Sequence, residues 1–333
     1  MAYDTREYTR ITRQWLNQRF DLFDSDGIYI PNQPAYGFSA LAFRLEEYAR
    51  MYAVLRVLNR MRFTSVLDVG CADAYGPALI RYLFSTPVWG IDLSDRALLR
   101  GRDMFGIAGA ASNAESLPFP DRSVDVVICT EVLEHVPSPQ RVISELIRVS
   151  RKFVVVTTPR APSELAKTEH FDTLDPNEPH AHIHYFTDSD MRVLTGPEAW
   201  ISGARSRCIH HLLARLAWGD ERTERQRLDY LAFSLESASL NNHSRRRMQM
   251  MLIDQYAKGP GWRRYVLTPP AAACLLRIDA ALAAWLPFLA HDHIAVISVS
   301  ADTVLSRGVL SSGRILKALL GGFSVPPLKR RSQ

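Results

Sequence analysis

The chain has 333 residues, a formal net charge of +5 at pH 7 and a pI near 9.1. A hydrophobic content of 47% excludes an intrinsically disordered chain, and the length suggests about two domains. The mild basic charge comes from scattered arginines, a weak signal for nucleic acid, so no nucleic-acid partner is expected. Four cysteines without a Cys-x-x-Cys pair indicate neither a disulfide framework nor a zinc site.

The stretch before the first predicted strand is mainly helical in pattern. Helices are predicted over residues 8–20 and 41–61, the second with apolar residues at helical spacing. Between them lies an aromatic, turn-rich stretch whose Tyr29 and Tyr36 could contact a ligand; a loop anchored by aromatic packing is the alternative. The N-terminus has no secretory apolar region, so a cytoplasmic location is expected, and no transmembrane segment is predicted.

The segment from Ser65 to Gly76 is the centre of the sequence. Its first half, Ser-Val-Leu-Asp-Val, is β-branched and apolar, as a strand buried on both faces requires. Gly70 ends this strand, and small residues follow until a helix predicted over residues 77–84. A strand, a tight turn and a helix N-terminus together favour a nucleotide-like ligand. Asp68, an acid near the strand end, indicates a polar role at the carboxyl edge of a sheet.

Three further strands also lead into polar residues. The strand 86–92 ends at Asp92, 24 residues after Asp68, a spacing at which an acid binds ribose hydroxyls in βαβ nucleotide sites. The strand 108–112 leads into Asn113, and a strand over 126–129 leads into Thr-Glu-Val-Leu-Glu-His. We therefore expect the carboxylates of Asp68 and Asp92 side by side at one sheet edge, facing a common cleft.

In this order and spacing, the motifs resemble those of the class I S-adenosylmethionine-dependent methyltransferases, in particular their type 11 branch. The resemblance covers residues 62–160 tightly. It implies a doubly wound, Rossmann-like α/β fold with a seven-stranded sheet whose last strand is antiparallel, and S-adenosyl-L-methionine as cofactor. It also implies that the segment before the first strand folds over the cofactor pocket as a lid. A dinucleotide dehydrogenase, the competing class, requires a Gly-x-Gly-x-x-Gly loop that this chain lacks.

Transferred position by position, the resemblance implies a set of cofactor contacts. Asp68 and the loop backbone would lie by the methionine moiety, Asp92 would hold the ribose hydroxyls, and Asn113 would accept from the adenine amino group. The sequence departs from the family pattern at Ala72 and Ala74, where glycines are usual, and at Asn113, where aspartate is usual. The full predicted set is Asp68, Gly70, Cys71, Ala72, Asp92, Leu93, Asn113, Ala114, Thr130 and Glu131.

A histidine-rich segment follows the fifth predicted strand, 153–159. Its alternating histidines would share one face of an extended segment: His180, His182 and His184. They could bind a metal together with Glu169, His170 and Asp172. We favour His182 or His184 as a general base for a hydroxyl substrate and expect no metal; a structural role is the alternative. His135 is a further candidate for substrate binding.

Two residues are placed to cap helices. Ser138 precedes an amphipathic helix predicted over 139–148, and Thr187 precedes another helix start. The predicted organisation has five parts: an N-terminal helical lid (1–61), a cofactor-binding core (62–210), a helical insertion (211–290), a last core strand (291–302) and a C-terminal tail (303–333). A sixth strand is expected within 199–210.

The predicted insertion separates the last two strands. Its Pro269-Pro270 pair should break it into two parts, and Arg277, Asp279 and Pro287 argue against a membrane span over 271–290. The insertion could pack on the core, cover a hydrophobic substrate or form a homodimer interface.

The predicted activity is methyl transfer to a small-molecule or glycan-like acceptor, with oxygen favoured as the acceptor atom. Two alternatives belong to other classes. A non-catalytic methyltransferase-like protein, which binds the cofactor weakly or serves as a partner scaffold, is suggested by Ala72 and Ala74. A nucleic-acid methyltransferase is disfavoured because the fourth strand is not followed by an Asn/Asp-Pro-Pro-Tyr/Phe motif.

Overall fold

The computed structural model describes residues 5–22, 45–161, 163–164, 181–206, 269–300, 303 and 305–321. Several predicted site residues lie outside the described residues: Tyr29, Tyr36, Glu169, His170, Asp172 and His180. Most of the predicted insertion also lies outside them.

A seven-stranded sheet forms the centre of the described fold, with the order β3-β2-β1-β4-β5-β7-β6. The strands are β1 (Val66–Val69), β2 (Val88–Asp92), β3 (Ala108–Ala111), β4 (Val124–Thr130), β5 (Ser150–Pro159), β6 (Trp200–Gly203) and β7 (Asp292–Ser298). Strands β1 to β5 are parallel, and β7 runs antiparallel to both β5 and β6. The predicted doubly wound α/β fold with an antiparallel last strand is confirmed.

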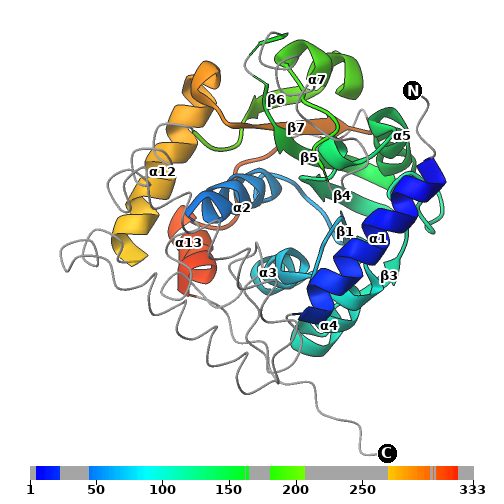
Figure 1. The fold of residues 1–333 in the computed structure, drawn as a ribbon. Coiled ribbons are helices and arrows are strands. Elements are labelled where there is room, and N and C mark those ends of the chain that lie inside the picture. Colours follow the sequence, from blue (N-terminus) through cyan, green and yellow to red (C-terminus); the bar gives the residue numbers. More distant parts are fainter. Residues whose placement is uncertain are drawn as a thin grey trace, which may run out of the picture.

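Helices cover both faces of this sheet (Figure 1). On one face lie α2 (Leu45–Leu58), α3 (Tyr75–Phe84), α12 (Pro269–Trp285) and α13 (Ser312–Gly321), and on the other lie α5 (Pro139–Val149) and α7 (Asp188–Thr195). Side chains alternate between the two cores along the central strands, as the pleat of a strand requires. In β4, for example, Val126 and Ile128 belong to the first core, whereas Val127 and Cys129 belong to the second.

Two helices belong to the sheet edge near β2 and β3. Helix α4 (Asp95–Phe105) follows β2 and packs on β2 and β3, and α1 (Thr5–Leu22) packs on α4. The predicted first helix is confirmed with slightly wider bounds. The second predicted helix ends at Leu58, where the chain turns, rather than at Met61.

The segments after residue 268 pack into the core more closely than the sequence suggested. Helix α12 begins at the Pro269-Pro270 pair, a position where the missing N–H costs nothing, and packs on α2 and α13. Helix α13 lies inside the predicted C-terminal tail, yet Leu316 and Leu319 are buried. The side-chain amide of Asn59 makes two hydrogen bonds with the backbone of Leu310. Its Nδ2 donates to the Leu310 carbonyl and its Oδ1 accepts from the Leu310 N–H, both at 2.8 Å, which fixes the entry to α13.

The two predicted helix caps have different outcomes. Thr187 forms a capping box with Asp190 at the start of α7, so this prediction is confirmed. Ser138 stands at the N-cap position of α5, but its side chain makes no capping hydrogen bond, so that prediction is wrong. The Ser138 backbone N–H instead donates to Glu115 Oε1 at 3.0 Å, and Pro139 at the first helical position leaves one donor fewer to cap. Among the described helices, none is both long and apolar enough to cross a membrane.

Candidate functional site

The loop after β1 is held against the end of β2 by its own backbone. The N–H groups of Gly70 and Cys71 donate to the Ile91 carbonyl at 2.7 and 3.0 Å, and the Ala72 N–H donates to Asp92 Oδ2 at 2.8 Å. Gly70 has a φ of +81°, and a Cβ atom there would lie 2.2 Å from Cγ2 of Val132. Only glycine fits this position, because both the conformation and the close approach of Val132 exclude a side chain.

Ala72 and Ala74 adopt the left-handed conformation, with φ values of 48° and 59°. This conformation costs an alanine roughly 1–2 kcal/mol relative to its right-handed form. The two alanines therefore preserve the turn that glycine would form, at a conformational cost. A Cβ at Gly101 of α4 would lie 2.7 Å from the Ala74 Cβ, so α4 approaches the loop closely.

The predicted ribose acid, Asp92, is buried at the end of β2. Its Oδ2 accepts from the Ala72 N–H, and its Oδ1 accepts from the Ser94 N–H at 2.8 Å. Burial raises the pKa of Asp92, and these backbone N–H groups oppose the rise. A carboxylate has about four acceptor positions, so Asp92 keeps acceptor capacity for a hydroxyl donor of a ligand.

Asp68 lies on β1, next to β2, as predicted. Its Oδ1 is buried and has no hydrogen-bond partner among the described residues. Burial and the nearby charge of Asp92 raise the pKa of Asp68 to about 7. A Cβ at Gly76 would lie 3.2 Å from Asp68 Oδ2, so the absence of a side chain there leaves space beside the carboxylate. A buried acceptor without a donor fits a ligand that brings one.

The predicted adenine end is formed by the loops after β2 and β3. The Ser112 N–H donates to the Asp92 carbonyl at 3.0 Å, which joins the two loops. Asn113 Oδ1 accepts from the Glu115 N–H at 2.9 Å, so part of its acceptor capacity closes the local turn. Leu93, Asn113 and Ala114 are half-buried at this edge. The buried Cys71 side chain packs against Gly90 of β2, where a Cβ would lie 2.5 Å from its Sγ.

Helix α1 touches both ends of the same sheet edge, which Figure 1 shows as a diagonal crossing in dark blue. Near the end of β2, Arg13 Nε donates to the Leu93 carbonyl at 3.0 Å, and Asn17 bonds Ser94 and Asp95 at 2.7 and 2.6 Å. At the other end, Tyr8 forms a small buried cluster with Ala181 and Ile183. No sequence pattern indicates Arg13 or Asn17, because arginine and asparagine are common on exposed helix faces.

Glu131 follows β4 in a strained conformation, with a φ of 54°. Its Oε1 accepts from Thr157 Oγ1 at 2.9 Å, and its Oε2 forms an ion pair with Arg50 at 3.1 Å. Burial raises the pKa of Glu131 to about 7, although the Arg50 charge opposes the rise. Thr130, the last residue of β4, is half-buried beside it.

The turn after Glu131 (Leu133–His135) meets the histidine-rich segment. The N–H groups of Ile183 and His184 both donate to the Glu134 carbonyl, at 2.8 and 3.1 Å. His135 Nδ1 bonds the Ala181 carbonyl at 2.9 Å, and the rings of His135 and His182 meet edge to face at 4.6 Å between centroids. Ligand atoms of Glu134, His135 and His182 lie within 4.8 Å of one another.

The two predicted general bases are in different surroundings. His182 belongs to the group just described, whereas His184 Nε2 bonds the Val136 carbonyl at 3.0 Å, and its ring stacks on Phe186. Glu134 was not among the predicted site residues. Its position next to His135 could have indicated a role in the site. The contact with residues 181–185, however, arises only from the fold, which brings them against the turn that contains Glu134.

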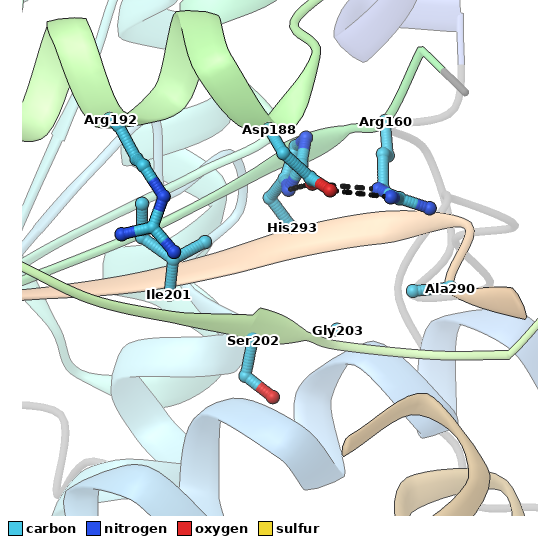
Figure 2. A pocket seen from close by; sticks show the side chains of 8 residues that line it. All are labelled: Arg160, Asp188, Arg192, Ile201, Ser202, Gly203, Ala290 and His293. Atoms are coloured by element: carbon cyan, nitrogen blue, oxygen red, sulfur yellow. Dashed lines mark hydrogen bonds and ion pairs between the residues drawn. The ribbon is translucent and has the colours of Figure 1, made fainter. Parts of the chain in front are cut away.

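A separate pocket lies between α7 and the strands β6 and β7 (Figure 2). Within it, Arg160 holds both carboxylate oxygens of Asp188, at 2.9 and 2.6 Å. His293 lies 3.6 Å from Asp188 through Nδ1 and bonds the Phe186 carbonyl through Nε2 at 3.0 Å. These charges pair with one another and fasten the start of α7 to the sheet.

Part of the chain is similar to known proteins. Residues 67–154 match a family model described as a methyltransferase domain. Over 107 residues the chain is 33% identical to a probable S-adenosylmethionine-dependent methyltransferase of Mycobacterium tuberculosis. The aligned region covers 31% of this chain and 39% of that protein. Residues 67–154 therefore match a methyltransferase domain, and this relative is named as an S-adenosylmethionine-dependent methyltransferase.

Other relatives also match part of the chain. A phosphatidylethanolamine N-methyltransferase of Cereibacter sphaeroides is 36% identical over 94 residues, covering 26% of this chain and 45% of that protein. The chain thus spans less than half the length of these curated relatives. A magnesium protoporphyrin IX methyltransferase from Synechocystis, solved with S-adenosylhomocysteine, aligns at 18% identity and a TM-score of 0.41, covering 59% of this chain and 91% of that one.

The methyltransferase domain, as matched, holds only part of the candidate site. Asp68, the loop from Gly70, Asp92, Asn113 and the turn with Glu134 lie inside residues 67–154. Helix α1 and the histidine-rich segment lie outside it. The candidate site therefore extends into parts of the chain that the family model does not match.

Proposed function

We propose that this chain transfers a methyl group from S-adenosylmethionine to a small, polar acceptor, with oxygen as the favoured acceptor atom. The observation that carries the proposal is the pairing of two sets of groups at one sheet edge. One set is Asp68, Asp92 and the loop from Gly70. The other is the turn at Glu134 with the histidines beside it. Val132, which packs on Gly70, directly connects them.

Two features of the chain fit the cofactor. Asp92 keeps acceptor positions for hydroxyls after its two backbone bonds, and Asp68 has a buried oxygen that lacks a donor. S-adenosylmethionine supplies a sulfonium-bound methyl group, so the protein mainly has to align and desolvate the reactants. The acceptor oxygen forms the new bond to carbon, the methyl–sulfur bond breaks, and the hydroxyl proton leaves to a base or to water.

The proposed acceptor class is supported by residues of this chain rather than by its relatives. The relatives include phosphatidylethanolamine and demethylmenaquinone methyltransferases, whose acceptors differ. Here His182 and the half-buried Tyr185 stand beside the Glu134 turn. Such donors and acceptors suit a polar substrate. Helix α1, which contacts the loops at both ends of the edge, would be the lid.

Calorimetric titration with S-adenosylhomocysteine tests the first step. A cofactor enzyme gives a saturable heat that Asp92→Ala reduces at least tenfold in affinity, about 1.4 kcal/mol. If millimolar S-adenosylhomocysteine gives no heat of binding, the result would favour the scaffold alternative. A screen of hydroxyl-bearing small molecules, read by S-adenosylhomocysteine formation, then tests transfer, with His182→Ala as the comparison.

A further inference from the structure

In the turn after β4, a ring nitrogen of His135 faces a carboxylate oxygen of Glu134. His135 Nδ1 bonds the Ala181 carbonyl, and a carbonyl can only accept, so Nδ1 carries a proton. In the neutral imidazole, Nε2 then carries the lone pair that can bind a metal. This Nε2 lies 3.9 Å from Glu134 Oε1. That separation is too long for a direct hydrogen bond.

Glu134 Oε1 is buried and has no hydrogen-bond partner among the described residues. The other oxygen, Oε2, accepts from Thr158 Oγ1 at 3.1 Å, so the carboxylate is fixed in orientation. Only 1% of the Glu134 residue is exposed, so solvent does not satisfy Oε1. A buried acceptor of this kind requires a partner that accepts electron pairs.

We propose that Glu134, His135 and His182 bind a divalent transition-metal ion. The proposal deepens the function proposed above, on which its catalytic meaning rests, and gives His182 the role of a ligand in place of a base. Two donors each about 2.1 Å from one ion lie at most about 4.2 Å apart, so the 3.9 Å pair fits. The three ligand atoms lie within 4.8 Å, which leaves only a small side-chain rotation to complete the set.

The hydrogen bonds around Glu134 and His135 resemble those around the ligands of known metal sites. Ligating histidines normally donate their second ring nitrogen to a carbonyl or carboxylate, as His135 does to Ala181. Ligating carboxylates are normally hydrogen-bonded, as Glu134 is by Thr158. Two imidazoles and one carboxylate favour zinc, manganese, iron or cobalt over magnesium and calcium. Three protein ligands leave positions open for water or substrate.

This places the ion where an acceptor oxygen would enter. A bound cation lowers the pKa of a hydroxyl group that coordinates it. The hydroxyl proton passes to water, the oxygen bonds the methyl carbon, and the methyl–sulfur bond breaks with its electron pair remaining on sulfur. The preferred acceptor would carry a second oxygen beside the reacting hydroxyl, since an open site can hold both.

The test is titration of the tag-free, chelator-treated full chain with Co²⁺, followed by visible absorption. Wild type should bind one ion, and Glu134→Gln and His182→Ala should each weaken binding at least tenfold. His184→Gln is the matched control, since His184 Nε2 bonds the Val136 carbonyl, and it should bind Co²⁺ as wild type does. Affinity for S-adenosylhomocysteine, measured on every variant, shows that each one is folded.

The outcomes separate the two proposals. A chain that binds S-adenosylhomocysteine but takes up no Co²⁺, or whose variants take it up equally well, overturns the metal site and leaves methyl transfer standing. A chain that binds Co²⁺ through Glu134 and His182 but not S-adenosylhomocysteine keeps the metal site and overturns the proposed function.

Discussion

The backbone N–H of Ala72 donates to the Asp92 carboxylate across a distance of 2.8 Å. This bond joins the loop after β1 to the end of β2, so the two parts of the proposed cofactor site hold each other in place. The carboxylate has a second backbone bond, to Ser94, at the start of α4. Asp92 is therefore both a proposed ligand of the cofactor and a structural clamp.

Asp92→Asn should separate these two roles. An amide keeps one carbonyl oxygen but replaces the other with a donor, which would face a backbone N–H. We expect affinity for S-adenosylhomocysteine to fall at least tenfold and the free energy of unfolding to fall by about 1–3 kcal/mol. Calorimetry and urea unfolding measure the two quantities. Unchanged affinity in a folded variant would contradict the ribose assignment.

Asp68 should make stability depend on pH. The group ionises near its ordinary pKa of 3.8 when unfolded and near about 7 when folded, so between these values the folded state binds more protons. Its contribution to stability is thus full below about pH 4 and is lost as the pH rises through about 7. Asp68→Asn removes this pH-dependent loss of stability. The free energy of unfolding of the variant, relative to that of wild type, should therefore increase from pH 4 to 7 and then level off.

The size of that increase is at most about 4 kcal/mol, because one pKa unit corresponds to about 1.4 kcal/mol. Urea unfolding at several pH values measures it. Asp73 and Glu131 contribute similar slopes in both proteins, so the difference isolates Asp68. A ligand role predicts in addition that the stabilised variant binds S-adenosylhomocysteine more weakly. A constant difference between the two proteins at all pH values would show that Asp68 is not the titrating group.

Gly70→Ala should destabilise the fold by about 2–3 kcal/mol or more. The added Cβ would meet Val132 Cγ2 at 2.2 Å and would also be strained by the φ of +81°. The double variant Gly70→Ala with Val132→Ala removes the contact with the Val132 side chain and keeps the backbone strain. Thermal unfolding should therefore show partial recovery in the double variant. Additive effects of the two changes would mean that the contact is not the cause.

Asn17→Ala should speed the dissociation of S-adenosylhomocysteine. The change removes the bonds from α1 to Ser94 and Asp95, each worth about 1 kcal/mol, so a rise of roughly fivefold to thirtyfold is expected. Stopped-flow displacement measures the rate. Gln18→Ala is the control, because Gln18 lies on the exposed face of the same helix. Equal rates in both variants would argue against α1 as a lid.

Ala72→Gly should tighten cofactor binding or leave it unchanged, since glycine adopts the observed φ of 48° without strain. Ala72→Val should weaken it at least tenfold, because a β-branched residue in this conformation is a strong outlier. Calorimetry compares the three proteins at one temperature. If valine binds as well as alanine, the loop backbone does not approach the ligand.

Much of the fold follows from local pattern. The central strands are short apolar runs buried on both faces, and their order came from the resemblance of motifs that include Asp68 and Asp92. Long-range packing was harder to predict. The amphipathic pattern of 312–321 indicates a helix, but not that Asn59 would fix its entry or that its leucines would fill the core beside α2.

The site shows the same division. Spacing along the chain was enough to place Asp68 and Asp92 together, because parallel strands end at the same edge. It was not enough to bring His182 to Glu134, since about 50 residues separate them and the contact depends on backbone bonds from Ile183 and His184. The Ser138 side chain does not cap α5, and the Arg141 N–H, the donor it would accept from, bonds the Ser138 carbonyl instead.

Helix α1 touches the loop at Leu93 with one end and the segment at Ile183 with the other. A fragment trimmed to residues 67–154 would keep the loop after β1 and would lose both α1 and the histidine-rich segment. Efforts to express, screen or engineer this protein should therefore begin upstream of residue 5 and extend past β7. A shortened piece that fails to react would say nothing about the whole.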